Sequence, residues 1–122
     1  MTLKVSSYGS SGGLSNKIAH QSTVTQTVDE DVLGTSGTII SVDIDNQHSA
    51  TIFLKMKTTT GSYVSGTTYP DHQFRIPGST SKRFDFTSGL RFSQLTFWCN
   101  SGGEYDSTTS PGGTVLVTFI CS

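Results

Sequence analysis

The stretch TTYPDHQFRIPGSTSKRFDFTSGLRFS, residues 67–93, contains three short runs of aromatic and aliphatic residues separated by Pro-Gly and Ser-Gly breaks. In the runs HQFRI and SKRFDF, apolar side chains alternate with polar ones, which is the period of a half-buried strand. The third run, GLRFS, follows the break at TSG. The pattern predicts strands whose buried faces consist of Phe74, Ile76, Phe84, Phe86, Leu90 and Phe92.

The same alternation occurs upstream, in TIISVDID (38–45) and ATIFLKMK (50–57). The polar segment NQHS between them has the composition of a turn, so the two runs are predicted to form a β-hairpin. In that hairpin Lys55 lies on the face opposite Ile52, Leu54 and Met56, together with Thr51 and Phe53. The predicted buried faces are Ile40, Val42 and Ile44 in the first strand and Ile52, Leu54 and Met56 in the second.

Three further runs complete the pattern. STVTQTV (22–28) alternates, and LRFSQLTFWC (90–99) changes parity near Ser93 or Gln94, which predicts a β-bulge there. TVLVTFIC (114–121) is apolar on both faces, as in a central strand that is covered on both sides. No segment has a helical period. The sequence therefore predicts an all-β, jelly-roll-like antiparallel β-sandwich of about seven or eight strands.

The composition and net charge of the chain argue against a nucleic-acid-binding protein and a membrane protein. The chain of 122 residues fits one domain, and Ser, Thr and Gly make up 51 of them. The net charge of −1 gives no electrostatic reason to bind nucleic acid or an acidic membrane. No apolar run approaches the roughly 20 residues of a membrane span. Met1 without an apolar leader indicates a product made in a cytoplasm.

The first part of the chain has no strand or helix period. Residues 1–21 are predicted to be an arm that is either disordered or ordered along a neighbouring subunit, and residues 22–122 form the sandwich. The apolar side chains of such an arm are candidate partner contacts. They are Leu3, Val5, Tyr8 and Leu14.

The residues capable of catalysis do not form a recognisable motif. Asp71 and His72 suggest a hydrolase, but no G-x-S-x-G elbow occurs, and neighbours on a strand point to opposite faces. The pair is better explained by a turn followed by a strand. We therefore predict that the chain is not an enzyme and has no cofactor.

Cysteines and carboxylates leave alternatives open. A disulfide between Cys99 and Cys121 would close a loop of about 20 residues, although a cytoplasmic origin favours free thiols. The residues that complete a zinc set, such as a CxxC pair or a nearby His, are not found. Asp43 and Asp45 share a strand face and are either calcium ligands or a solvated strand end. Asp29, Glu30 and Asp31 form a second acidic cluster, which fits a charged turn.

Three tyrosines lie outside the strand pattern, in loops rich in Gly, Ser and Thr. They are Tyr63, Tyr69 and Tyr105. Loop tyrosines provide a large contact area at a small entropic cost, so they suit sugar-binding or protein-binding surfaces. The alternative is that each tyrosine packs over the end of the sandwich.

The segment FRIPGSTSKRFDFTSGLRFS, which follows GTTYPD and precedes GTVLVTFICS, resembles small β-sandwich structural proteins of tailed bacteriophages. The similarity is greatest to capsid decoration, or cement, proteins, and it covers roughly residues 37–122. It implies a homotrimer that binds the major capsid protein on the outer surface of the virion. The alternative is a receptor- or glycan-binding module of a phage tail or fibre.

Overall fold

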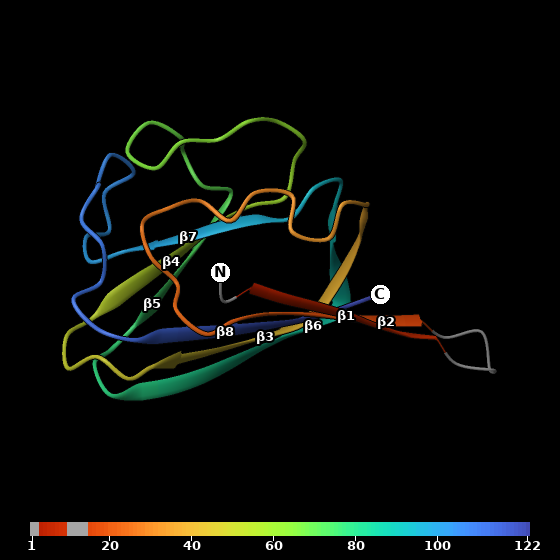
Figure 1. The fold of residues 1–122 in the computed structure, drawn as a ribbon, viewed down its shortest axis with the longest axis horizontal. Coiled ribbons are helices and arrows are strands. Elements are labelled where there is room, and N and C mark those ends of the chain that lie inside the picture. Colours follow the sequence, from red (N-terminus) through yellow and green to blue (C-terminus); the bar gives the residue numbers. More distant parts are fainter. Residues whose placement is uncertain (1–2, 10–14) are drawn as a thin grey trace.

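The computed structural model describes residues 3–9 and 15–122, which form eight β-strands in two antiparallel sheets. The sheets lie face to face as a β-sandwich (Figure 1). None of the described residues lies in a helix, so no helix is available to cross a membrane. The strands are β1 (Leu3–Gly9), β2 (Ser15–Gln21), β3 (Gly37–Asn46), β4 (Ile52–Lys57), β5 (His72–Ile76), β6 (Thr80–Phe92), β7 (Thr96–Asn100) and β8 (Val115–Cys121).

The strand order is that of a jelly roll. The five-stranded sheet has the order β1-β2-β8-β3-β6, and the three-stranded sheet has the order β5-β4-β7. Residues 25–32 run along the outer edge of β7, where the Cys99 N–H donates to the Thr25 carbonyl and Asp29 forms a bridge with Phe97. With this segment counted as an irregular fourth strand, each sheet contributes four neighbouring strands to the sandwich. The predicted fold class is confirmed.

The core lies between the two sheets, as the alternation predicted. Ile76 and Phe92 are buried, whereas the other four residues named for the stretch 67–93 are partly buried and pack against the core. Phe97 of β7 meets Phe119 of β8 across the interior at a ring-centroid distance of 5.0 Å. Burial of these apolar side chains is the main stabilising contribution to the fold.

The predicted face of β3 is wrong at its first residue. Val42 and Ile44 are buried, but the register of β3 shifts between Ile39 and Ser41 against both β6 and β8. Against β8 the bulge inserts one residue in β3, whereas against β6 residues 86–89 lie between the paired residues Asp85 and Leu90. Ile39 is buried as a result, and Ile40 is 40% exposed. A bulge is not visible in a pattern of apolar residues when two isoleucines are adjacent.

The predicted hairpin of β3 and β4 is also wrong, because β3 belongs to the five-stranded sheet and β4 to the three-stranded one. The intervening turn carries the chain across the sandwich. The buried Asn46 side chain fixes this crossing, since its Nδ2 donates to the carbonyls of Ala50 (2.9 Å), Ile76 (3.3 Å) and Pro77 (3.0 Å). Alternation determines which face of a strand is buried, but it does not determine the neighbouring strand.

Three smaller predictions need correction. The segment 80–92 is one strand, with Gly89 at a φ of 75°, where a break at TSG was predicted. Residues 93–95, where a bulge was predicted, carry the chain from β6 to β7 in the other sheet. Strand β8 is central, but its side chains alternate between buried and half-buried, so only one face is fully covered.

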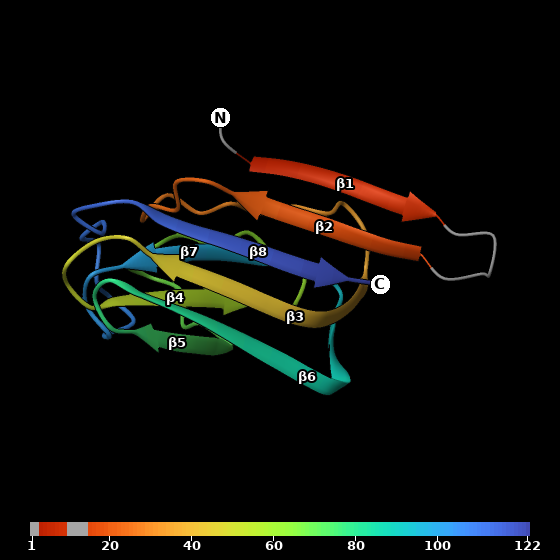
Figure 2. The ribbon, with the colours of Figure 1, turned by 90° about the horizontal axis from the view of Figure 1, so that it is seen from below.

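The N-terminal segment differs from the predicted arm. Strand β2 pairs with β8, and β1 pairs with β2, so both extend the five-stranded sheet. The hairpin of β1 and β2 lies at the edge of the sandwich and reaches beyond its end (Figure 2). Residue 21 is therefore not a boundary between an arm and the sheet. Backbone pairing with β8 explains a strand that has little apolar periodicity of its own.

Candidate binding surface on the loop layer

Two long loops cover the face of the three-stranded sheet that points away from the core (Figure 1). We call residues 58–71, between β4 and β5, and residues 101–114, between β7 and β8, the loop layer. The loops touch at Gly66, which has a φ of 89°, and a Cβ there would lie 2.4 Å from Cγ2 of Thr108. Only glycine fits this approach.

Beneath the loop layer lies a second, more polar packing layer. Lys55, Trp98 and Asn100 alternate with core-facing residues, and all three are fully buried. Lys55 Nζ donates to the Glu104 carbonyl, and Asn100 Nδ2 donates to the Thr109 carbonyl at 3.3 Å. Burial lowers the pKa of Lys55, against the opposing charge of Glu104. The second loop is therefore attached to the sheet by two buried donors.

This buried layer was missed by the sequence prediction, which placed Lys55 opposite the core-facing residues of its strand without a covering layer. Alternation alone cannot reveal that a loop covers that face. A signal was present in Trp98, which is out of phase with the core-facing Phe97 and requires a second apolar environment. Among the described residues, neither Trp98 Nε1 nor Asn100 Oδ1 has a hydrogen-bond partner.

The structure brings together two of the three predicted loop tyrosines. Tyr69 comes from the first loop and Tyr105 from the second, and their rings stack with a centroid distance of 3.8 Å and an interplanar angle of 16°. Tyr69 is 66% exposed and Tyr105 is 38% exposed. The hydrogen-bonding and charge interactions with Tyr69 raise the pKa of Tyr105. The pair therefore presents aromatic surface to solvent and also joins the two loops.

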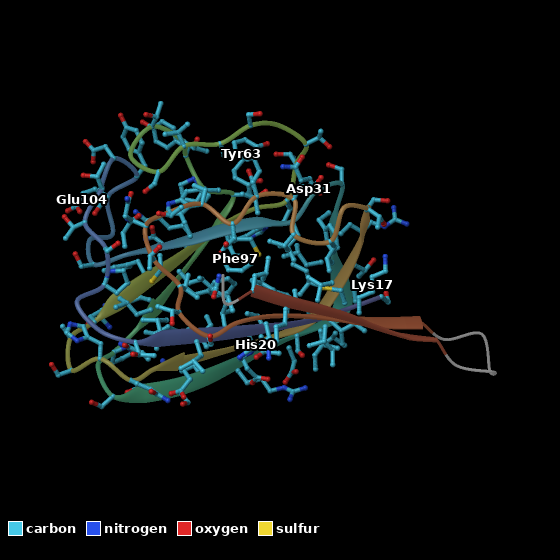
Figure 3. All side chains as sticks on the ribbon, viewed as in Figure 1. Lys17, His20, Asp31, Tyr63, Phe97 and Glu104 are labelled. Atoms are coloured by element: carbon cyan, nitrogen blue, oxygen red, sulfur yellow. The ribbon has the colours of Figure 1, made fainter. Side chains whose placement is uncertain are left out.

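Tyr63 has a different environment and does not join the stack. Its hydroxyl donates to the Thr59 carbonyl at 2.7 Å, and its backbone N–H donates to a Glu30 carboxylate oxygen at 2.6 Å. Lys57 Nζ lies 5.1 Å from the centre of its ring. Figure 3 shows Tyr63 above β7 and Phe97 between the sheets. Tyr63 is half-buried and fixes the conformation of the first loop.

Three of the predicted contacts of the N-terminal segment belong to β1 in the other sheet. Leu3 of β1 packs against the core, and Val5 is 44% exposed. Tyr8 is part of β1, but its side chain is outside the described residues, as is Leu14 altogether. Leu3 and Val5 therefore lie outside the loop layer, and the role of all four residues as contacts stays a prediction.

Asp71 has a structural role beside the loop layer. It accepts hydrogen bonds from the Thr58 N–H at 2.9 Å and from Lys57 Nζ at 3.0 Å. Burial raises the pKa of Asp71, but these hydrogen bonds outweigh burial and lower it below its ordinary value. The carboxylate therefore holds the end of β4 beside the start of β5, where His72 pairs with Met56.

The other candidate ligands are dispersed or already engaged. Asp43 lies 3.8 Å from Arg83, and Asp45 accepts from Ser81 Oγ at 2.7 Å, so their shared face is occupied by protein contacts. Within the described part of the chain, no group of three His, Cys, Asp or Glu side chains has the arrangement of a metal site.

The two cysteines are free and lie in different sheets. Cys99 is in β7 and Cys121 is in β8, and both side chains are buried. Burial raises the pKa of each thiol to about 12. Thiolates are the reactive form of cysteine, so both side chains act as small apolar core residues.

Comparison with known proteins adds no relative. No family model matches the chain, and no curated protein matches it.

Proposed function

We propose that this chain is a non-enzymatic structural protein that decorates the outer surface of a virus capsid and stabilises the shell. The observation that carries the proposal is the Tyr69–Tyr105 stack, an exposed aromatic surface built on a rigid sheet. Aromatic anchors of this kind dominate the affinity of protein–protein contacts. The resemblance of residues 37–122 to capsid decoration proteins specifies the partner, the major capsid protein.

The loop layer suits a role as a docking surface. The second loop is fixed to the sheet by the buried Lys55 and Asn100 side chains, and the first loop is joined to the second at Gly66 and at the stack. Little conformational entropy remains to be lost when such a surface binds, which favours affinity. A homotrimer would present three stacks at once, and multivalent attachment converts weak single contacts into a durable one.

The copy number of the chain in purified virus particles tests the proposal. Quantitative mass spectrometry should find many copies in a fixed ratio to the major capsid protein. A few copies per particle would indicate the tail or fibre module instead, and complete absence would exclude a virion role.

Attachment to the shell should also depend on the stack. We expect the double substitution Tyr69→Ala and Tyr105→Ala to weaken binding to bare particles, because each aromatic anchor contributes about 2 kcal/mol. Co-sedimentation with particles measures the effect. Ser62→Ala, an exposed substitution in the same loop, is the matched control. Equal binding of the double variant and the control would contradict the assignment of the stack as the contact.

A further inference from the structure

A cleft of about 500 Å³ opens at the end of the sandwich where β3 begins and β4 and β6 end. Its size lies within the range of roughly 300–1,000 Å³ that is typical of small-molecule sites. The cleft is separate from the Tyr69–Tyr105 stack, since neither tyrosine lines it. The lining residues are Ser36, Gly37, Thr38, Thr58, Thr59, Arg91, Phe92 and Ser93.

The lining has the chemistry of a site for a polyhydroxylated anion. Five of the eight residues are Ser or Thr, whose hydroxyls donate and accept hydrogen bonds. Arg91 is exposed, and none of the ion pairs formed by the described residues includes it. No acidic side chain is among the lining residues. The guanidinium is therefore available for a carboxylate, which it can bind with two parallel hydrogen bonds.

The wall formed by Thr58 and Thr59 is already ordered. Thr58 donates its N–H to Asp71, and its carbonyl accepts the Ser93 N–H at 2.9 Å. The Tyr63 hydroxyl donates to the Thr59 carbonyl. These contacts fix two sides of the cleft relative to one another, so a ligand would meet preorganised polar groups.

The floor of the cleft is apolar and closely packed. Phe92 belongs to the core and is 5% exposed. A Cβ on Gly37 would lie 3.0 Å from the Phe92 ring and 2.5 Å from the Ser122 carbonyl oxygen, so only glycine fits against these two residues. A ring with polar edges and an apolar face fits such a floor better than a small inorganic anion does.

We propose that this cleft binds a sugar that carries a carboxylate, with the carboxylate on Arg91 and the ring hydroxyls on the Ser and Thr side chains. The inference is independent of the capsid proposal, because it uses another surface and needs no shell. The same chemistry is present in a free acidic monosaccharide and in the terminal residue of a glycan.

Titration of the whole chain with D-glucuronate at neutral pH, followed by two-dimensional NMR, tests the proposal. We expect amide shifts that concentrate at residues 36–38, 58–59 and 91–93, with a dissociation constant of the order of 1 mM. D-glucose, which has the same ring without the carboxylate, should bind about tenfold more weakly or not at all. Acetate, which has the carboxylate without the ring, should also bind more weakly.

Two variants define the role of the guanidinium. Arg91→Gln should weaken glucuronate binding about tenfold. Arg91→Lys should retain part of the wild-type affinity, because the positive charge remains while the two parallel hydrogen bonds of the guanidinium are lost. Arg75→Gln is the matched control, since Arg75 is exposed on β5 and does not line the cleft. A native-like spectrum establishes that each variant is folded.

Several outcomes would overturn the proposal. They are the absence of shifts in the cleft with glucuronate, equal binding of glucose or acetate, and unchanged binding by Arg91→Gln. If glucuronate binds as proposed, a glycan array distinguishes the free sugar from a terminal acidic residue. Failure of the capsid proposal would leave this result unaffected, because the particle assay does not involve the cleft.

Discussion

Asn46 is a single side chain that directs the path of the chain between the two sheets. It is 1% exposed, and its amide donates to the carbonyl of Ala50 in the turn and to those of Ile76 and Pro77 at the end of β5 and just after it. Its Oδ1 also accepts the His48 N–H at 3.1 Å. Buried backbone polar groups need partners, and at this crossing Asn46 supplies them.

Replacement of this side chain should therefore be costly. We expect Asn46→Ala to lower the free energy of unfolding by about 2–3 kcal/mol, because buried carbonyls would be left without donors. Urea denaturation measures the loss. Gln47→Ala is the control, since Gln47 is exposed, and it should change the stability by less than about 0.5 kcal/mol. A loss for Asn46→Ala no larger than that of the control would contradict the role assigned to the amide.

The sequence predicted the local position of a residue, in a loop or a strand, more reliably than it predicted the residue's contacts. The loop position of Tyr69 and Tyr105 followed from the Gly, Ser and Thr around them, but their contact depends on loops that are far apart in the chain. Lys55 was misplaced for the same reason, since the loop that buries it comes from residues 101–114. Arg91 gave no signal, because a cleft between strand ends exists only after the sheets have packed.

At the scale of elements, the loop layer behaves as a lid fixed at a few points. One of these is Gly66, where a positive φ coincides with contact to Thr108. Trp98, the only tryptophan of the chain, is buried beneath the lid. Its fluorescence therefore reports on whether the loops remain in place.

Substitution of the glycine should lift the loops without unfolding the sheets. We expect Gly66→Ala to shift the Trp98 emission to longer wavelength, because the left-handed backbone and the Thr108 contact both disfavour a Cβ, at a cost of about 1–2 kcal/mol. The circular dichroism of the strands should stay unchanged. Ser62→Ala in the same loop should leave the emission as in the wild type. Identical emission from the two variants would contradict this account of the loop contact.

Strands were predicted well and their partners poorly. The alternation of residues 50–57 and 72–76 arises from one buried face, which is a local property that the sequence carries. The neighbours of a strand depend on the whole topology, so β3 and β4 were paired wrongly. Residues 22–28 were predicted to be a strand. From Thr25 on they run beside β7, but the segment forms too few regular hydrogen bonds with β7 to be a strand.

At the scale of the molecule, the two free thiols connect stability to alkaline pH. Cys99 and Cys121 come from opposite sheets, and burial raises the pKa of each to about 12 from 9.0. Above pH 9 the unfolded chain loses these protons while the folded chain retains them. The folded state then binds more protons than the unfolded state, so stability falls as pH rises from about 9 to 12.

Removal of one thiol should reduce this loss. Between about pH 8.5 and 10.5, we expect Cys99→Ala to lose about 2 kcal/mol less stability than the wild type, since the slope is about 1.4 kcal/mol per pH unit for each thiol. Urea denaturation at each pH gives the difference. Lys55 has the opposite effect, because burial makes its pKa lower in the folded state than in the unfolded state, and the folded state therefore gains stability as pH rises. Lys55→Met should therefore make the loss of stability at alkaline pH steeper than in the wild type. Parallel profiles for the wild type and Cys99→Ala would contradict the prediction.

The position of β8 has a consequence for how the protein is made. This strand follows the other seven described strands in sequence, yet it lies between β2 and β3 and joins the N-terminal hairpin to the rest of its sheet. Until the ribosome has translated residue 121, the earlier strands of that sheet have no central neighbour. Folding must then close contacts across nearly the full length of the chain, which is slow. In the nascent polypeptide these strands are therefore exposed to solvent until β8 is made. A chaperone that shields them during translation should raise the yield of native protein.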